Sequence, residues 1–244
     1  MSDAAQNPPQ ISIVIPICNE EALLARNVTE IRRQLKEIRG LDWEIILIEN
    51  GSTDQTLQIA EQLSEDPSIQ TISLLNANYG IALQTGFLKA SGSVIVNFDI
   101  DYWDVEFVDI VSHVMKVKYD IIIASKNLLL SKDRRGILRK VASYGFRMIL
   151  FFMFGLRVSD THGIKAWRNS EKMQSYFRQA FPAHHTFDTE VIIRAMYDQC
   201  EVLEIPVEVI EMRTSDHHIL KRVPQALKEL LAIRKRLNHE KLSE

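Results

Sequence analysis

Short apolar runs alternate along the chain with longer segments in which apolar residues recur at helical spacing. The runs are rich in Ile and Val, and the first of them ends at Pro16. We interpret them as buried strands over residues 11–16, 43–49, 69–75, 93–98 and 120–125. Helices are expected between them, over residues 19–39, 55–63, 80–90 and 105–117. This alternation predicts an α/β fold with a mainly parallel central sheet flanked by helices.

Polar side chains follow these apolar runs, at the ends where the strands should finish. In open α/β sheets, ligands bind outside the carboxyl ends of the strands. That rule places one set of polar residues along a single rim of the sheet: Asn19, Glu49, Asn50, Asp54, Asp99, Asp101 and Lys126. A carboxylate buried without a partner costs several kcal/mol. The acids after the fourth run, which also include Asp104, are therefore expected to meet something positive.

Asp99 and Asp101 form an Asp-x-Asp sequence directly after the fourth run. Mg²⁺ typically takes one or two carboxylates, and substrate phosphates and water complete its shell. The chain has neither a GxGxxG nor a P-loop sequence near these acids, so backbone amides are not expected to cradle a phosphate here. A divalent cation on Asp99 and Asp101 fits the pattern, and a solvated loop would show the same short motif.

Composition and charge narrow the classes of protein. The 244 residues, 46% of them hydrophobic, are enough for one sizeable core, and the net charge of −3 argues against a nucleic-acid partner. Cys18 and Cys200 lack metal-ligand spacing and suit a reducing compartment. The first ten residues resemble no signal peptide, and no stretch reaches the ~20 apolar residues of a membrane span. We expect a cytoplasmic chain that is soluble or peripheral to a membrane.

We expect three regions along the chain: a disordered tail over residues 1–10, one large domain over 11–217 and a basic helix over 218–244. The segment 126–147 holds seven basic residues against one acid, a local net charge of +6. A solvated basic face and an anion-binding site both fit this excess. The basic residues of the segment are Lys126, Lys132, Arg134, Arg135, Arg139, Lys140 and Arg147.

The apolar run MILFFMF, residues 148–154, follows the basic segment directly. It is interpreted either as a buried core helix or as an interfacial helix whose aromatic side chains meet lipid. The C-terminal helix, expected over residues 218–238, adds further Lys and Arg residues. Each Lys or Arg near anionic lipid contributes ~1 kcal/mol. Contact with an anionic membrane surface is therefore one hypothesis, and core packing of the Phe cluster is the other.

Four segments carry a resemblance to a known family: residues 13–21 (IVIPICNEE), 47–56 (LIENGSTDQT), 78–101 and 160–167 (DTHGIKAW). Their order and spacing resemble the inverting glycosyltransferases of GT-A (Rossmann-like) fold that include dolichyl-phosphate mannose synthases and polyprenyl-phosphate glycosyltransferases. The resemblance runs from residue 11 to about 213. It implies a nucleotide-sugar donor, GDP-mannose or UDP-glucose, a Mg²⁺ or Mn²⁺ ion and inversion at the sugar C1.

The resemblance also assigns roles on the donor side. Asp99 and Asp101 match the family's metal-binding Asp-x-Asp, with Asp101 favoured as the direct ligand. Glu49 and Asn50 replace a pair of aspartates that the family usually has, which leaves the base open. Asp54 fits a third acidic position, although capping of a helix is an equal alternative. The residues that line the nucleotide-sugar pocket are then Pro16, Asn19, Glu20, Glu49, Asn50, Asp54, Asp99 and Lys126.

On the acceptor side, lipid-phosphate members of the family bind the acceptor phosphate with an Arg and, four residues later, a Ser. Arg139 and Ser143 have that spacing, one helical turn apart on one face. Lys126 stands where those enzymes have an Arg after the fifth strand, and Arg213 fits their late Arg. The Gly-x-Ser-Lys pattern that commonly follows is missing. The segment 160–163 resembles the one that closes over the donor sugar. His162 in it either contacts the diphosphate or the metal, or has a structural role.

Asp188 separates the hypotheses about function. Family members that glycosylate a hydroxyl use an acid in this segment as general base, whereas a phosphate acceptor is already ionised. The favoured hypothesis is transfer of mannose or glucose to polyprenyl or dolichyl phosphate at a membrane surface, with Asp101, Arg139, Ser143 and Arg213 in catalysis. The second is transfer to a sugar or other hydroxyl with Asp188 as base. The third is a non-catalytic nucleotide-sugar binding protein.

Overall fold

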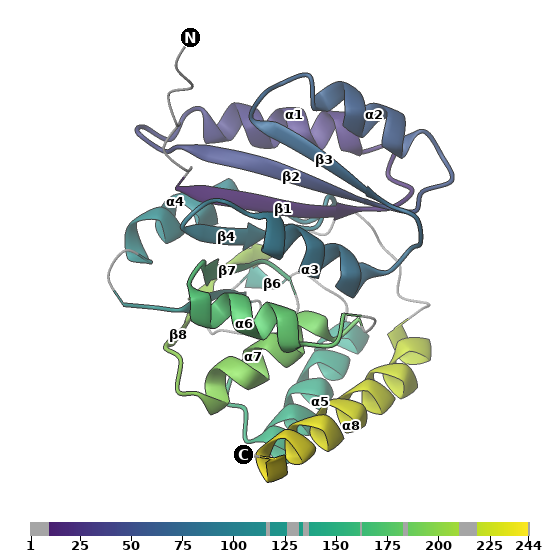
Figure 1. The fold of residues 1–244 in the computed structure, drawn as a ribbon, viewed down its shortest axis with the longest axis vertical. Helices are drawn as coiled ribbons and strands as arrows, with labels where there is room; N and C mark the ends of the chain where they lie inside the picture. The colour runs from purple at the N-terminus through teal and green to yellow at the C-terminus, as the bar shows by residue number, and fades with distance from the viewer. Residues whose placement is uncertain are drawn as a thin grey trace.

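The computed structural model describes residues 10–115, 118–125, 132–133, 137–161, 163–182, 185–209 and 219–243. Within these ranges, only the backbone is described at 132–133, 137–140, 208–209, 219–222 and 241–243. The described chain forms a central sheet covered by helices on both faces (Figure 1). The α/β prediction is therefore confirmed.

Seven strands of the described chain form the central sheet, in the order β3-β2-β1-β4-β7-β5-β8. β7 runs antiparallel to its neighbours β4 and β5, and the other pairs are parallel, so the prediction of a mainly parallel sheet is confirmed. The strands are β1 (Ile11–Ile17), β2 (Trp43–Asn50), β3 (Ile69–Leu74), β4 (Val94–Asn97), β5 (Ile121–Ser125), β7 (Lys165–Arg168) and β8 (Val202–Pro206). Two further short strands, β6 (Lys132–Asp133) and β9 (Glu208–Val209), pair with each other.

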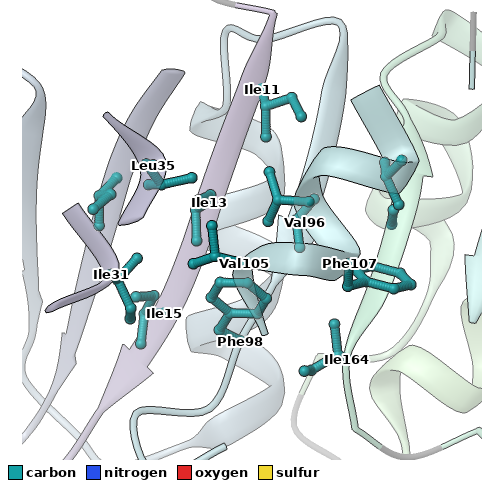
Figure 2. Close-up of a cluster of buried hydrophobic side chains, with 14 of the residues drawn as sticks. Ile11, Ile13, Ile15, Ile31, Leu35, Val96, Phe98, Val105, Phe107 and Ile164 are labelled. Carbon is teal, nitrogen blue, oxygen red and sulfur yellow. The ribbon is translucent and has the colours of Figure 1, made fainter. Parts of the chain in front are cut away.

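Apolar side chains are buried on both faces of the sheet, which explains why the central strands are continuous Ile and Val runs. All seven residues of β1 are buried. On one face, Ile31 and Leu35 pack over Ile13 and Ile15 of β1, as Figure 2 shows. The opposite face has its own buried cluster, which includes Phe87, Trp167 and Phe177 in mutual ring contact. These two layers hold the sheet rigidly and so fix the position of its rim.

From β1 to β5 the helices alternate with the strands as expected. The helices are α1 (Leu24–Leu35), α2 (Thr56–Leu63), α3 (Tyr79–Lys89), α4 (Val105–Val114), α5 (Ile137–Phe154), α6 (Glu171–Gln179), α7 (Phe187–Tyr197) and α8 (Ile219–Ser243). The expectation that a helix begins at Asn19 is wrong, because Asn19 has a φ of 55° and the chain turns before Leu24. A left-handed residue cannot continue a right-handed helix. The chain uses residues 19–23 as a loop at the rim instead.

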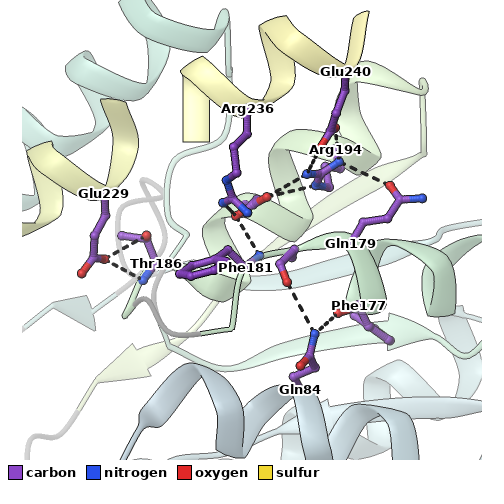
Figure 3. A network of polar contacts seen from close by, with 11 residues as sticks. Gln84, Phe177, Gln179, Phe181, Thr186, Arg194, Glu229, Arg236 and Glu240 are labelled. Carbon is purple, nitrogen blue, oxygen red and sulfur yellow. Dashed lines mark hydrogen bonds and ion pairs between the residues drawn. The ribbon is translucent and has the colours of Figure 1, made fainter. Parts of the chain in front are cut away.

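The C-terminal helix α8 packs beside α5 and α7 at one end of the molecule (Figure 1). A buried polar network joins α8 to α7 (Figure 3). At its centre the fully buried carboxylate of Glu190 accepts hydrogen bonds from Arg194 at 2.9 Å and from Arg236. Arg194 also pairs with Glu240 at 2.7 Å. Arg236 lies over the ring of Phe181, 4.9 Å from its centroid.

Replacing Glu190 by Gln should lower the free energy of unfolding by about 3 kcal/mol or more, because two arginines would lose the buried charge that compensates them. Urea unfolding followed by circular dichroism measures the change. Glu240→Gln is the matched control. The Glu240 side chain is half exposed, so its loss should cost no more than about 1 kcal/mol. Equal losses for the two variants would show that Glu190 is not the centre of the network.

Candidate active site

The loops after β1 and β2 lie side by side at the carboxyl rim, because the two strands are neighbours in the sheet. The backbone N–H of Asn19 donates to Ser52 Oγ at 3.0 Å. The Asn19 side chain accepts from the backbone N–H of Thr53 at 2.8 Å, and the backbone N–H of Glu20 donates to Thr56 Oγ1 at 2.7 Å. The sequence-predicted residues Asn19 and Glu20 are thus brought together with the 51–56 loop.

Glu49 and Asn50, which end β2, are both buried. The two carboxylate oxygens of Glu49 accept from the backbone N–H of Ser52 at 2.5 Å and from Ser73 Oγ at 2.6 Å. Asn50 Oδ1 accepts from the backbone N–H of Asn78 at 2.6 Å. In this structure both residues therefore shape the rim loops. Their sequence-predicted contacts with base and ribose stay predictions.

Asp54 accepts hydrogen bonds from the backbone N–H of Thr56 at 2.9 Å and of Glu21 at 3.3 Å. The hydroxyl of Thr56 also donates to it, and this bond lowers the pKa of the Asp54 carboxyl. Asp54 thereby ties the start of α2 to the loop after β1. Pro16, another predicted pocket residue, is buried within β1.

Asp99 and Asp101 lie in a tight turn just after β4. The turn is closed by two backbone bonds between Asp99 and Tyr102, at 3.1 and 3.0 Å. Asn27 of α1 donates to the carbonyl of Ile100 at 2.7 Å and so holds the turn against the domain. The predicted pair of carboxylates is therefore on one rigid turn at the rim. Asp104, three residues further on, caps α4 through the backbone N–H of Phe107 at 3.1 Å.

Tyr79, at the start of α3, donates its hydroxyl to Asp99 Oδ1 at 3.1 Å. Burial raises the pKa of the Tyr79 hydroxyl well above its usual value, and the negative charges of Asp99, Asp188 and Asp101 add to the shift. Tyr79 therefore stays protonated and keeps donating to Asp99.

Asp188, in the first turn of α7, forms a buried ion pair that the sequence analysis did not foresee. Its Oδ2 lies 2.8 Å from Nζ of Lys165, whose side chain has no exposed surface. Nζ of Lys165 also donates to the carbonyl of Gly163 at 2.7 Å, and Asn97 Nδ2 donates to the same carbonyl at 3.2 Å. The signal in the sequence was a lysine inside the apolar segment 164–167.

The described residues at the carboxyl rim of the sheet suit a divalent cation, such as Mg²⁺, that takes only one or two ligands from the protein. Among the described residues, no group of three or more His, Cys, Asp and Glu side chains is placed to hold a metal ion. Asp99 and Asp101 supply two carboxylates from one turn, and Mg²⁺ commonly completes such a set with substrate phosphates and water. The residues present therefore fit a site that a cation would share with its substrate, and the assignment of a metal to Asp99 and Asp101 stays a prediction.

The predicted acceptor residues are only partly described. Arg139 and Ser143 both lie on α5, where a spacing of four places them on one face, and Ser143 is half-buried. The side chain of Arg139 lies outside the described residues, as do Lys126, Arg213 and His162. Their predicted roles stay predictions.

A mainly parallel sheet with an Asp-x-Asp turn at its carboxyl rim is the arrangement expected of a glycosyltransferase of GT-A fold. The sequence model described as "Glycosyl transferase family 2" matches residues 12–177, and the chain belongs to that family. The predictions of the family and of a glycosyltransferase are confirmed.

Named relatives extend this result. Dolichyl-phosphate beta-glucosyltransferase of Saccharomyces cerevisiae is 27% identical, over 92% of this chain and 74% of the relative. Undecaprenyl-phosphate 4-deoxy-4-formamido-L-arabinose transferase of Pectobacterium carotovorum is 37% identical, over 37% of this chain and 28% of the relative. Glucosyl-3-phosphoglycerate synthase from Mycobacterium tuberculosis, solved with Mn²⁺, UDP and product, has a TM-score of 0.69 at 18% identity. That match covers 93% of this chain and 80% of the other, and it shows a shared fold.

Proposed function

We propose that the chain transfers a hexose from a nucleotide sugar to polyprenyl or dolichyl phosphate, with Mg²⁺ or Mn²⁺ at the rim. The observation that carries the proposal is the Asp-x-Asp turn held by Tyr79 at the carboxyl edge of a family 2 sheet. Relatives named as dolichyl-phosphate and undecaprenyl-phosphate sugar transferases support the lipid-phosphate acceptor. The glucosyl activity of two of them favours glucose over mannose.

In this proposal the donor lies across the rim formed by the loops after β1, β2 and β4. Asp99 and Asp101 would hold the cation, which when bound stabilises the charge on the departing nucleoside diphosphate. Tyr79 keeps the Asp99 carboxylate oriented, and the loops fixed by Glu49, Asn50 and Asp54 shape the nucleotide pocket. Solved fold neighbours with UDP-glucose and Mn²⁺ support UDP-glucose as the donor to test first.

Arg139 and Ser143 would hold the acceptor phosphate. An Arg offers a planar fork of donors and a Ser its hydroxyl, a combination suited to a phosphate monoester. A phosphate oxygen attacks C1 in line, the bond from C1 to the diphosphate breaks, and the nucleoside diphosphate leaves with the electron pair. No proton has to be removed from the acceptor, because it is already ionised near neutral pH.

A hydroxyl acceptor is the second candidate, because Asp188 lies near the Asp-x-Asp turn. The ion pair of Asp188 with Lys165 argues against it.

Product analysis with a panel of donors tests the proposal. GDP-mannose, UDP-glucose and UDP-GlcNAc are each offered with polyprenyl phosphate and Mg²⁺ or Mn²⁺, and the lipid product is scored. We expect a lipid-linked hexose from one donor. Transfer only to a hydroxyl acceptor would refute the proposal.

The proposal includes reversible attachment to an anionic membrane surface. Within the part of the chain that the structure describes, no helix is long and apolar enough to span a bilayer. The Phe-rich helix α5 has features of both hypotheses made from the sequence, core packing and contact with lipid. Leu150 and Phe154 are core residues, whereas Phe152 is 74% exposed. Val141, Tyr144 and Phe151 are exposed at helical spacing beside Phe152. Such a stripe is the apolar half of an interfacial surface.

Basic residues on α8 would supply the electrostatic half. Lys228 and Lys235 are exposed on the same helical face as Leu231. Arg236, in contrast, forms an ion pair with the buried Glu190.

Replacing Lys228 and Lys235 together by Gln should weaken binding to vesicles of anionic lipid by roughly thirtyfold, at ~1 kcal/mol for each charge. Phe152→Ser should weaken it as well, and salt should reduce the electrostatic part. Vesicle sedimentation at low and high salt measures both effects. The control is Leu75→Ser, since Leu75 is almost fully exposed but lies after β3, far from α5 in sequence. No binding of the unchanged chain at low salt would end the membrane hypothesis.

A further inference from the structure

Lys165 is the one lysine that is buried among the residues that the structure describes. It lies at the start of β7, and its backbone pairs in register with Asn97 at the end of β4. Its ammonium group donates to Asp188 Oδ2 at 2.8 Å and to the carbonyl of Gly163 at 2.7 Å. A buried charge is tolerated only when it is paired and hydrogen-bonded. The partner of this lysine is therefore the Asp188 carboxylate.

Both oxygens of Asp188 already accept hydrogen bonds. Oδ2 faces Lys165, and Oδ1 accepts from the backbone N–H of Thr189 at 2.8 Å. The side chain is 3% exposed. Each oxygen of the carboxylate is therefore already engaged by a donor of the protein itself. In this arrangement Asp188 is a poor general base.

The ion pair of Lys165 and Asp188 lies near the Asp-x-Asp turn, so it can affect proton transfer at the site. Lys165 pairs in register with Asn97, two residues before Asp99, and the side chains of Lys165 and Asn97 both donate to the carbonyl of Gly163. A hydrogen bond from Thr189 Oγ1 to Thr161 Oγ1, at 3.2 Å, joins the first turn of α7 to the segment before β7. It adds to the connection that the ion pair of Asp188 and Lys165 makes. Asp188 therefore stands beside the Asp-x-Asp turn, where a free carboxylate would be in a position to accept a proton from an acceptor.

We propose that Lys165 is a positioning residue that withdraws Asp188 from proton transfer, so that the site serves only acceptors that arrive already ionised. The inference rests on the proposed function and deepens it, because it names the feature that sets the acceptor class. Removing the lysine frees Asp188. A water molecule can then attack C1 while its proton passes to Asp188, the bond from C1 to the diphosphate breaks, and the nucleoside diphosphate leaves with the electron pair.

Three variants test the inference: Asp188→Asn, Lys165→Met and the double variant that combines them. The donor probe is UDP-glucose with Mn²⁺, and the acceptors are undecaprenyl phosphate and water. Asn keeps an oxygen for Lys165 to bond but cannot accept the proton. The matched control is Arg194→Met, which breaks a buried ion pair with Glu190 on the same helix. Thermal unfolding is measured for every variant beside the two reaction rates.

We expect Asp188→Asn to keep transfer to undecaprenyl phosphate within about tenfold of the unchanged chain. Lys165→Met should raise hydrolysis of UDP-glucose at least about tenfold, and the double variant should return it to the original rate. Arg194→Met should lower the unfolding temperature without raising hydrolysis. A gain that depends on Asp188 cannot come from loss of stability alone.

Three results would overturn the inference: loss of lipid transfer in Asp188→Asn, hydrolysis unchanged in Lys165→Met, or an equal gain in Arg194→Met. If Lys165→Met does not yield folded protein, Asp188→Asn decides by itself. Other results would refute the proposed function without refuting the role of Lys165. Should the unchanged chain ignore undecaprenyl phosphate but glycosylate another ionised acceptor while Asp188→Asn stays active, the proposed lipid is wrong and the inference stands. Glycosylation of a hydroxyl acceptor by the unchanged chain would overturn the inference as well. An unchanged chain that binds no UDP-glucose or other nucleotide sugar in calorimetry refutes both.

Discussion

Asp101→Ala should abolish sugar transfer and leave the fold intact. The Asp-x-Asp turn is closed by backbone bonds between Asp99 and Tyr102 and is anchored by Asn27, and the substitution leaves these bonds in place. Loss of a cation ligand would remove stabilisation of the departing diphosphate, and we expect a fall in turnover of roughly a thousandfold or more. Rate assays with UDP-glucose and Mn²⁺, together with calorimetric titration of Mn²⁺, measure the two effects.

The control comes from the same loop. Asp104 caps α4, so Asp104→Ala should cost about 1 kcal/mol of stability and leave Mn²⁺ binding unchanged. Excess EDTA should stop transfer by the unchanged chain. Full activity in EDTA would refute the assignment of a metal to this turn.

Arg139→Ala should raise the KM for the lipid phosphate and lower turnover while donor binding stays nearly unchanged. A hydrogen bond to a charged group contributes about 1.5–3 kcal/mol, so kcat/KM for the acceptor should fall roughly 10- to 150-fold. Steady-state kinetics with each substrate varied in turn separates the two sides of the site.

Arg147, two turns further along α5, is the matched control. It lies on the same face of the helix as Ser143, and its guanidinium is 5.2 Å from the centroid of the Tyr144 ring. Because this contact already holds the guanidinium, Arg147→Ala should raise the acceptor KM far less than Arg139→Ala. The opposite ranking, with Asp188→Asn inactive and Arg139→Ala nearly normal, would establish a hydroxyl acceptor.

The sequence was sufficient for the parts of the fold that are encoded locally. The runs that became β1, β2 and β5 are strongly apolar because they are buried on both faces, and periodicity finds such strands. β7 and β8 were not predicted. β7 has four residues, two of them basic, and its antiparallel place between β4 and β5 depends on pairings distant in sequence.

The same limit applies to the site. Asp99 and Asp101 could be placed from their position after an apolar run, because strand ends share one rim. Lys165 could not, since its partner Asp188 comes from a helix more than twenty residues later and only the folded chain joins them. Arg236 shows the reverse error. It is one of the basic residues of the C-terminal helix that were counted toward membrane contact, whereas the fold uses it to balance Glu190.

The reversed direction of β7 gives the loop before it an unusual sensitivity to length. Side chains alternate along the strand. Lys165, which pairs with Asp188, and Trp167, which packs on Phe87 and Phe177, lie on one face, while Ile164 and Ala166 face the other core layer. A slip of one residue in this register would exchange the two faces. Isoleucine would then stand against Asp188, and an ammonium group would enter the apolar layer that holds Phe98 and Phe107. Insertions and deletions between residues 157 and 163 should therefore be far less tolerated than point substitutions there.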